Sequence, residues 1–197
     1  MMKSIRILFT LTLSVLIGLT SCEESTEVGE FDNWQERNTH YIDSIANVAR
    51  TNTYGDWKIF LAQGLDDSKQ WNGNEYYVYC QVIEDGYGTE HPLFTDSVVV
   101  NYSGRLIPSA TYPAGYKFDS SYGGEFKPSF NVPVTLALDE TVKGFYTAVQ
   151  NMVDGDTWKV YIPYQLGYGA SASTGVPAYS TLVFDITLVT FHHPTVN

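Results

Sequence analysis

Aromatic side chains are the most prominent groups in this sequence that could build a binding site. The chain of 197 residues contains 15 Tyr and 10 Phe. Tyrosine joins an apolar ring to a hydroxyl group, a combination that suits the lip of a cavity. This composition indicates a β-rich fold with an aromatic-lined cavity, and it would suit a carbohydrate-binding surface equally well.

Motifs for covalent or metal chemistry are poor. His192 and His193 are adjacent near the end of the chain, where a metal site would need further ligands, and His40 and His91 are isolated. The sequence has no Ser-His-Asp order, no Cys-x-x-Cys pair and no phosphate-binding loop. We therefore expect neither a metal site nor a cofactor.

The first residues are typical of an export signal. Lys3 and Arg6 supply positive charge, and an apolar run extends from Ile5 to Leu19, which is shorter than the roughly 20 residues of a membrane span. The run ends at Leu-Thr-Ser-Cys22, which looks like a bacterial lipobox. We predict a lipoprotein signal peptide over 1–21 and lipidation of Cys22, which would anchor the protein to a membrane of the bacterial cell envelope. The alternatives are an uncleaved anchor, or an ordinary signal with a chance cysteine.

The charge balance is acidic. The chain has 11 basic and 22 acidic residues, a net charge of −11, and loss of Lys3 and Arg6 with the signal would leave −13. An acidic surface repels nucleic acid and anionic headgroups, so we expect no nucleic-acid partner. If Cys22 is lipidated, Cys80 has no partner for a disulfide, and its apolar surroundings in the sequence predict a buried, inert thiol.

An N-terminal extension precedes the main domain. Residues 22–30 are acidic and polar and are predicted to form a tether. Residues 31–74 form the rest of the extension, with a predicted helix over 31–50 and a possible short strand over 57–61. In the helix, Trp34, Tyr41, Ile45 and Val48 recur at a spacing that draws one apolar stripe.

The region from 75 onwards is dominated by predicted strands. They cover 76–83, 96–107, 133–138, 158–162 and 181–189. One short helix is predicted over 145–152, where Phe145, Ala148, Val149 and Met152 share a face and Asp154-Gly155 stops it. Many strands around one short helix indicate an antiparallel α+β domain.

Four blocks of this region resemble the FKBP family of peptidyl-prolyl isomerases, and most closely its periplasmic, macrophage-infectivity-potentiator-like branch. The blocks are VVVNYSGRL at 98–106, KFDSS at 117–121, the segment 133–152, and the segment 155–185 with its GDTWKVYIPYQLGYG and STLVFD stretches. They occur in the family's order and at compatible spacing. The resemblance covers 75–191, leaves 192–197 as a tail, and implies an antiparallel twisted sheet wrapped around one short helix.

The resemblance also implies a binding pocket. Its catalytic positions fall on Tyr102, Phe118, Asp119, Tyr168 and Phe184, and its substrate-binding positions fall on Val134, Val142, Phe145 and Val176. Val142 would offer its backbone N–H to a substrate carbonyl. Phe145 stands where the family has a Trp floor, and Val134 where it has a Phe wall, so the pocket is expected to be aromatic but smaller than usual.

Asp119 has three possible roles: it could lie beside the rotating carbonyl, hydrogen-bond Tyr102, or cap a turn, and we favour the bond to Tyr102. Two segments, 108–116 and 123–131, are longer than in compact family members and could extend the peptide groove or fold over it. The loop that shapes substrate preference carries a single proline, Pro177, where the family often has two.

These observations predict a peptidyl-prolyl isomerase that binds Xaa-Pro segments and assists the folding of envelope or secreted proteins. An FKBP-fold lipoprotein that binds peptides without turnover is the alternative. A structural or nutrient-binding lipoprotein, with aromatic rings stacking on sugars, is disfavoured by the four-block resemblance. Related periplasmic members dimerise through long N-terminal helices, but the helix here is short and has one stripe, which favours a monomer over a dimer.

Overall fold

The computed structural model describes residues 29–124 and 131–194. The predicted signal peptide, Cys22 and nearly all of the predicted tether lie outside these ranges, as does most of the predicted expansion at 123–131. None of the helices within the two ranges has the length and apolarity that crossing a membrane requires.

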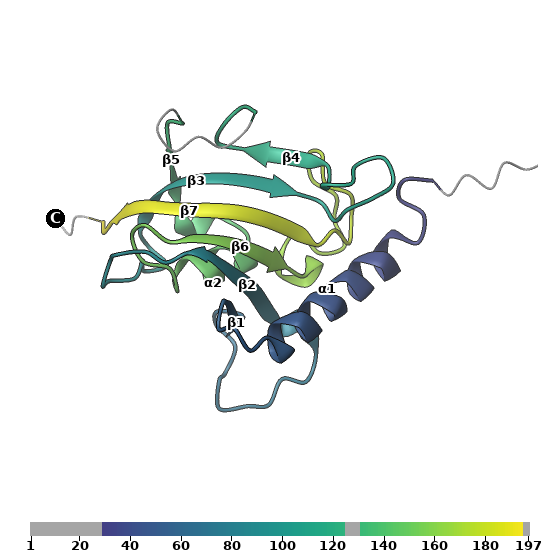
Figure 1. Cartoon of the computed structure of the whole chain (residues 1–197), viewed down its shortest axis with the longest axis horizontal. Coiled ribbons are helices and arrows are strands. Elements are labelled where there is room, and N and C mark those ends of the chain that lie inside the picture. The colour runs from purple at the N-terminus through teal and green to yellow at the C-terminus, as the bar shows by residue number, and fades with distance from the viewer. Residues whose placement is uncertain (1–28, 125–130, 195–197) are drawn as a thin grey trace, which may run out of the picture.

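The described chain forms a seven-stranded antiparallel sheet with one helix against each face (Figure 1). The strand order is β1-β2-β6-β7-β3-β4, and β5 pairs with the same edge of β3 that β4 pairs with further along. The strands are β1 (Trp57–Leu61), β2 (Tyr77–Glu84), β3 (Ser97–Arg105), β4 (Lys117–Ser120), β5 (Val134–Ala137), β6 (Thr157–Ile162) and β7 (Leu182–His192). The helices are α1 (Trp34–Thr51) and α2 (Lys143–Val149), with single 3₁₀ turns η1 (Asn74–Tyr76), η2 (Leu138–Glu140) and η3 (Tyr164–Leu166). The predicted α+β class is confirmed.

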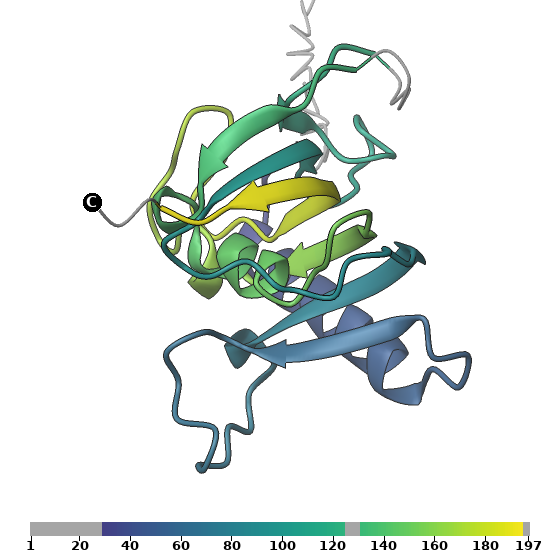
Figure 2. The same cartoon turned by 90° about the vertical axis from the view of Figure 1, so that its left-hand side faces the viewer.

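The two faces of the sheet bury different side chains because neighbouring residues of a strand point to opposite sides. On β2, Val78 and Cys80 join the main core around α2, whereas Tyr79 joins a smaller cluster under α1. On β6, Val160 and Tyr161 divide in the same way. The sheet is therefore sandwiched between α2 on one face and α1 on the other (Figure 2).

The short helix α2 carries the apolar face that the sequence predicts. Phe145, Ala148, Val149 and Met152 are all buried. The helical bounds differ from the predicted 145–152. The carbonyl of Val142 accepts the N–H groups of residues 145 and 146 and so starts the helix earlier, and the last residues close into a turn with three-residue spacing.

The predicted stripe of α1 is wrong in part. Its buried residues are Trp34, Asn38, Ile42, Ala46 and Ala49. The two alanines are small enough to let the helix lie close to the tyrosine-rich face of the sheet, so the helix turns these residues inward. The larger apolar residues of the predicted stripe are then displaced: Tyr41 and Ile45 are half-buried, and Val48 is 47% exposed.

The sheet begins upstream of the predicted domain start at 75. The strand β1 pairs with β2 along its whole length, from Trp57 opposite Gln81 to Leu61 opposite Tyr77. Cys80 in β2 is fully buried, and this burial raises the pKa of its thiol, as expected for an inert cysteine. The 31–74 extension thus contributes both a helix and an edge strand to the same fold.

Candidate functional site

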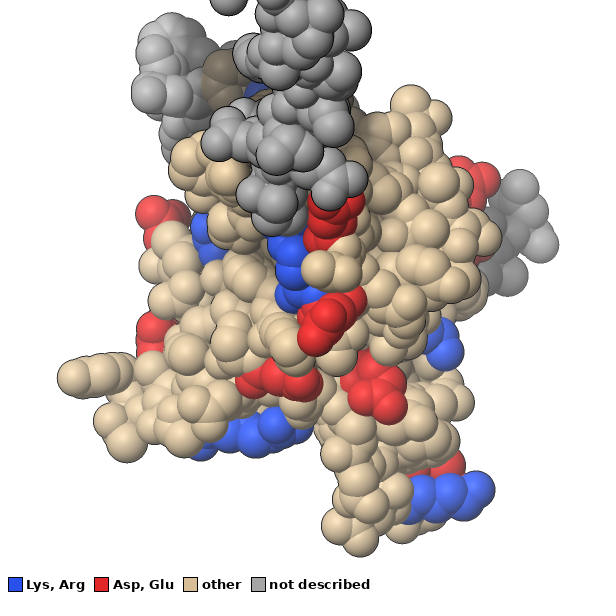
Figure 3. Space-filling view, turned by 90° about the vertical axis from the view of Figure 1, so that its right-hand side faces the viewer, with Lys and Arg blue, Asp and Glu red and all other residues tan. Residues whose placement is uncertain are grey.

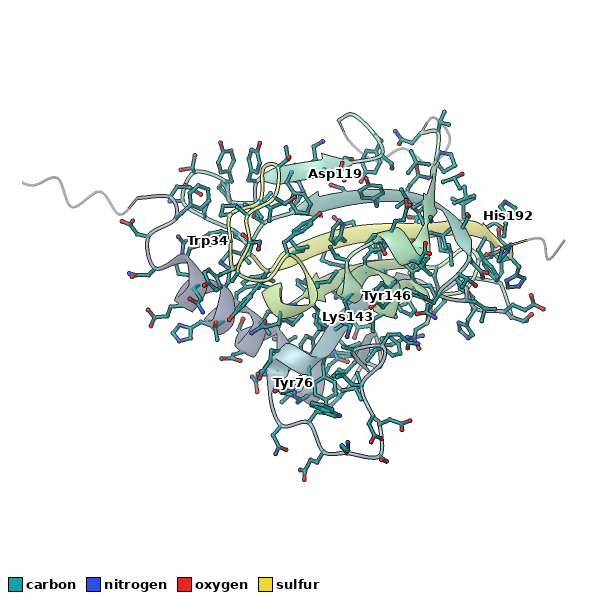
Figure 4. The ribbon with its side chains drawn as sticks, turned by 180° about the vertical axis from the view of Figure 1, so that it is seen from behind. Trp34, Tyr76, Asp119, Lys143, Tyr146 and His192 are labelled. Carbon is teal, nitrogen blue, oxygen red and sulfur yellow. The ribbon has the colours of Figure 1, made fainter. Side chains whose placement is uncertain are left out.

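One end of α2 and the outer strands enclose a pocket of about 160 Å³, which we call the aromatic pocket. Its lining comes from β3, β4, β5, the start of α2, the chain after η3 and β7. The lining residues are Tyr102, Asp119, Leu136, Thr141, Val142, Phe145, Tyr168 and Phe184. Figure 4 shows Asp119 on β4, with Lys143 and Tyr146 marking α2 nearby.

Three aromatic rings form the inner surface of the aromatic pocket. Phe145 lies edge-to-face with Phe184 at 5.3 Å and with Tyr102 at 6.2 Å between ring centroids. The side chains of Phe145 and Phe184 are 3% and 6% exposed. Phe118 packs edge-on against Phe184 at 5.6 Å and supports it from β4. Such edge-to-face packing fixes the rings beyond what area burial alone provides, so the inner surface is apolar and rigid.

A glycine makes room for this ring cluster. Gly104 pairs with Phe184 on β7 and with Asp119 on β4. A Cβ atom at this position would lie 2.6 Å from Phe118 and 2.6 Å from Phe184. The Tyr-Ser-Gly element of β3 therefore combines a ring that lines the pocket with an empty position that lets two further rings meet.

The polar wall of the aromatic pocket is a hydrogen bond from the hydroxyl of Tyr102 to the carboxylate of Asp119, with 2.7 Å between the oxygens. The other carboxylate oxygen of Asp119 accepts the backbone N–H of Ser120. Burial, followed by the bond to Asp119, raises the pKa of Tyr102, which keeps its hydroxyl protonated at physiological pH. The bond to Tyr102 that we favoured from the sequence is present, together with a local turn contact.

The opposite rim presents polar backbone. Val142 has an extended conformation and caps α2, so its carbonyl is occupied by two helical N–H groups. Its own N–H donates to no backbone carbonyl of the described residues. Tyr168, with a side chain 40% exposed, stands at the lip of the pocket. The pocket therefore combines an apolar interior with polar groups at its mouth.

Six of the nine residues that the sequence predicts for the site line the aromatic pocket. The other three lie beside it. Phe118 stands behind Phe184, Val134 pairs with Val100 and packs on the main core, and Val176 is buried in the wall of a neighbouring groove. Val134 and Val176 do not line the pocket because β5 and the loop before β7 present other residues there.

Two lining residues were missed by the sequence analysis. Leu136 lies two residues after Val134 on the same face of β5, so the strand alternation could have identified it. Thr141 precedes Val142 and donates its hydroxyl to the carbonyl of Leu138. No sequence pattern distinguishes this threonine from others in loops.

The terminal histidines have a structural contact. His193 lies 2.9 Å from the carboxylate of Asp96, which is 1% exposed and also accepts the backbone N–H of Leu93. This contact holds the end of β7 against the start of β3, remote from the aromatic pocket.

Comparison with known proteins assigns the family. Residues 88–189 match the family described as FKBP-type peptidyl-prolyl cis-trans isomerase. The chain is 40% identical over 110 residues to the FKBP-type peptidyl-prolyl cis-trans isomerase FkpA of Escherichia coli K12, and 35% identical over 119 residues to the peptidyl-prolyl cis-trans isomerase Mip of Coxiella burnetii. These matches cover 55% and 60% of this chain but 36% and 44% of the relatives, so the chain spans less than half of their length.

Solved structures show the same fold. The crystal structure of FkpA from E. coli has a TM-score of 0.53 at 28% identity and covers 81% of this chain and 63% of that chain. A peptidyl-prolyl cis-trans isomerase from Pseudomonas syringae has a TM-score of 0.56 at 24% identity, over 81% of this chain and 96% of that chain. With more than half of its residues matched, the chain belongs to the FKBP-type peptidyl-prolyl cis-trans isomerase family, in its FkpA- and Mip-like branch.

Proposed function

We propose that this protein is a peptidyl-prolyl cis-trans isomerase that binds Xaa-Pro segments of polypeptides in the aromatic pocket. The observation that carries the proposal is the apolar inner surface of Phe145, Phe184 and Tyr102, with polar groups only at its mouth. This arrangement matches what the reaction needs. The family to which the chain belongs supports the same activity.

The reaction requires neither a nucleophile nor a metal, because no bond is broken. Rotation about an amide must overcome a barrier of about 18–20 kcal/mol, which arises from resonance. A catalyst lowers this barrier if it binds the twisted amide more tightly than the planar one. The twisted amide has less charge separation, so an apolar environment favours it relative to water.

Each predicted site residue has a role in this scheme. Phe145, Phe184 and Tyr102 would hold the prolyl ring, with Phe118 and Val134 supporting them from behind. The N–H of Val142 and the hydroxyl of Tyr168 would bind carbonyl groups on either side of the proline and so fix its orientation. Asp119 would hold Tyr102 in place through their 2.7 Å hydrogen bond.

The proposal is tested by NMR exchange spectroscopy on a proline peptide with and without the protein. We expect faster cis–trans exchange, and we expect Phe184→Ala to abolish the acceleration. Peptide binding without any acceleration would instead support the alternative of a non-catalytic binding lipoprotein. If substitutions at Tyr102, Phe118 and Phe184 left both exchange and binding unchanged, the site assignment would be wrong.

We also propose that the protein is held on a membrane of the bacterial cell envelope by a lipid on Cys22, where it assists the folding of envelope or secreted proteins. The support is the apolar run before a Leu-Thr-Ser-Cys sequence. Cys22→Ser should move the protein from the membrane fraction to the soluble fraction of cells. Unchanged membrane retention of this variant would exclude the lipid anchor.

A monomeric state is proposed from the packing of α1. Its apolar residues Ile42, Ala46 and Ala49 are buried against the chain's own sheet, so this stripe is not free to pair with a second helix. Light scattering after size-exclusion chromatography should give the mass of one chain. A dimer that persists on dilution would contradict this proposal.

A further inference from the structure

A second hollow, which we call the outer groove, lies beside the aromatic pocket and has a volume of about 570 Å³. Three segments that are distant in sequence line it: the residues just before α1, the 108–116 insertion with Tyr116, and the loop before β7. They meet at the end of the molecule where α1 starts (Figure 1). The lining residues are Glu30, Phe31, Thr111, Tyr112, Tyr116, Ala172, Ser173, Gly175, Val176 and Pro177.

The loop that forms one wall of the outer groove is held by α1. The indole N–H of Trp34 donates to the hydroxyl of Ser180 at 2.8 Å, and the backbone N–H of Thr181 donates to the side-chain oxygen of Asn38 at 2.7 Å. Both contacts are buried. Figure 4 shows Trp34 at the start of α1, beside this loop. Because such buried bonds are costly to break, the wall is a fixed surface.

The insertion that forms the facing wall is also ordered by its own contacts. The backbone of Leu106 donates to the carbonyl of Tyr116 at 2.9 Å, and the guanidinium of Arg105 donates to the carbonyl of Gly115 at 3.0 Å. The rings of Tyr112 and Tyr116 pack edge-to-face at 5.2 Å. The rings remain accessible, with exposed fractions of 42% and 39%.

The outer groove and the aromatic pocket share a wall. A Cβ atom at Gly175 would lie 3.5 Å from Phe118, and the ring of Phe118 packs on Phe184 inside the pocket. The other connection is the chain from Tyr168, at the lip of the pocket, to Ala172 in the groove. A polypeptide lying in the pocket would therefore reach the groove within a few residues.

The chemistry of the groove is apolar and aromatic with one charge. Glu30 is the only charged residue among its ten lining residues, and Ser109 and Thr111 lower the pKa of its carboxyl, which stays negative at neutral pH. Figure 3 views this end of the molecule, and much of the visible surface there is uncharged. Exposed tyrosine and phenylalanine rings beside proline are suited to bind extended apolar chain.

We propose that the outer groove binds client residues that flank the proline held in the aromatic pocket, and that it favours apolar or basic residues over acidic ones. This inference rests on the proposed isomerase function and deepens it. The insertion and the residues before α1 would give the enzyme a longer contact with unfolded chains than the pocket alone provides. The volume of the groove lies in the range of about 300–1,000 Å³ that is usual for ligand sites.

The test compares two peptides on the full mature chain. One is a blocked tetrapeptide with an Ala-Pro core, and the other has the same core flanked on both sides by leucine and phenylalanine. We expect the unmodified protein to bind the longer peptide about tenfold more tightly, and Phe31→Ala combined with Tyr112→Ala to reduce this ratio about fivefold. Tyr54→Ala, at an exposed tyrosine beyond the far end of α1, is the matched control and should keep the ratio.

Three results would overturn the inference. They are equal affinity for both peptides, an unchanged ratio in the double variant, and an equal loss in the Tyr54→Ala control. A further peptide with glutamate flanks should bind more weakly than the leucine-flanked one, and Glu30→Gln should narrow that difference. If Glu30→Gln leaves the difference unchanged, the charge preference is wrong.

A measurement on the unmodified protein does not depend on the variants. Backbone NMR signals of Gly175 and Val176 should shift with the longer peptide beyond their shift with the tetrapeptide, and no additional shift would contradict the inference. If the same signals shift on dilution without peptide, a second copy of the chain occupies the groove instead. The affinity ratio is read separately from cis–trans exchange, so failure of the isomerase proposal is distinguishable from failure of the groove.

Discussion

The aromatic pocket and the outer groove lie side by side but are built differently. The pocket takes its inner surface from β3, β7 and α2, whose side chains belong to the main core. The groove takes its walls from a loop, an insertion and the residues before α1, which are held mainly by hydrogen bonds. The difference teaches that a change in the pocket must also affect folding, whereas a change in the groove can spare it.

The largest effect is expected where binding surface and core coincide. Phe145→Ala should lower the free energy of unfolding by about 3–5 kcal/mol, because a large buried ring leaves a cavity. It should also abolish isomerase activity. Urea denaturation measures the first effect and NMR exchange the second.

Phe145→Leu is the matched control for this prediction. It keeps an apolar side chain of similar size and should cost less than about 1.5 kcal/mol, while it removes one aromatic ring from the pocket. A Phe145→Ala variant as stable as the unmodified chain would show that the pocket is independent of the core, contrary to the comparison.

An intermediate effect is expected where α1 holds the wall of the groove. Asn38→Ala leaves the buried N–H of Thr181 without its acceptor and should cost about 1–3 kcal/mol of stability. It should weaken binding of the longer peptide more than that of the tetrapeptide. Asn47→Ala, an exposed asparagine on the same helix, should be neutral in both measurements. Equal losses for both peptides would mean that α1 supports the pocket as much as the groove.

A smaller effect is expected at the polar wall of the pocket. Tyr102→Phe removes the hydrogen bond to Asp119, but water can replace the hydroxyl because Asp119 is exposed. We expect kcat/KM to fall about fivefold, which corresponds to about 1 kcal/mol.

A double-mutant cycle with Asp119→Ala checks whether Asp119 acts through Tyr102. The losses of the two single variants should not add, because both remove the same bond. Fully additive losses would indicate that Asp119 acts on the substrate by itself.

The smallest effect is expected from alkaline pH and should appear first on the α1 face. Burial raises the pKa of Tyr79 from 10.0 to about 12, against a smaller lowering by Arg50. The unfolded chain therefore loses this proton at a lower pH than the folded chain does. The stability that depends on this proton is complete below pH 10 and is lost as pH rises from 10 to about 12.

Urea denaturation between pH 9 and pH 12 should show this loss, and Tyr79→Phe should reduce its slope. Tyr54→Phe, at an exposed position, should leave the slope unchanged. An identical slope in Tyr79→Phe and the unmodified chain would mean that the hydroxyl of Tyr79 contributes nothing to the alkaline loss.

Much of the fold was predictable because its signals are local. The alternation of β2 and the apolar face of α2 follow from residue spacing, and both are found in the structure. The stripe of α1 was not predictable in the same way. Ala46 and Ala49 carry a weak hydrophobic signal, yet their small size is what lets them face the sheet, while the more apolar Val48 faces solvent.

The aromatic pocket was predictable for the residues that lie in motifs. Tyr102, Asp119, Phe145, Tyr168 and Phe184 occur in blocks that resemble the family, and they line the pocket. Thr141 was missed because its position depends on how η2 meets α2. Val176 was expected in the pocket, but the loop before β7 places it in the groove instead.

The sequence by itself determined the class of fold, the family and most of the aromatic residues of the pocket, because these depend on residue type and on short, regular spacing. Only the tertiary structure decided that the residues before α1, the 108–116 insertion and the loop before β7 share one surface. Segments roughly 30 to 80 residues apart meet there through contacts such as Trp34 with Ser180 and Asn38 with Thr181. No local pattern encodes such a meeting, since it depends on how the sheet brings distant loops to one end.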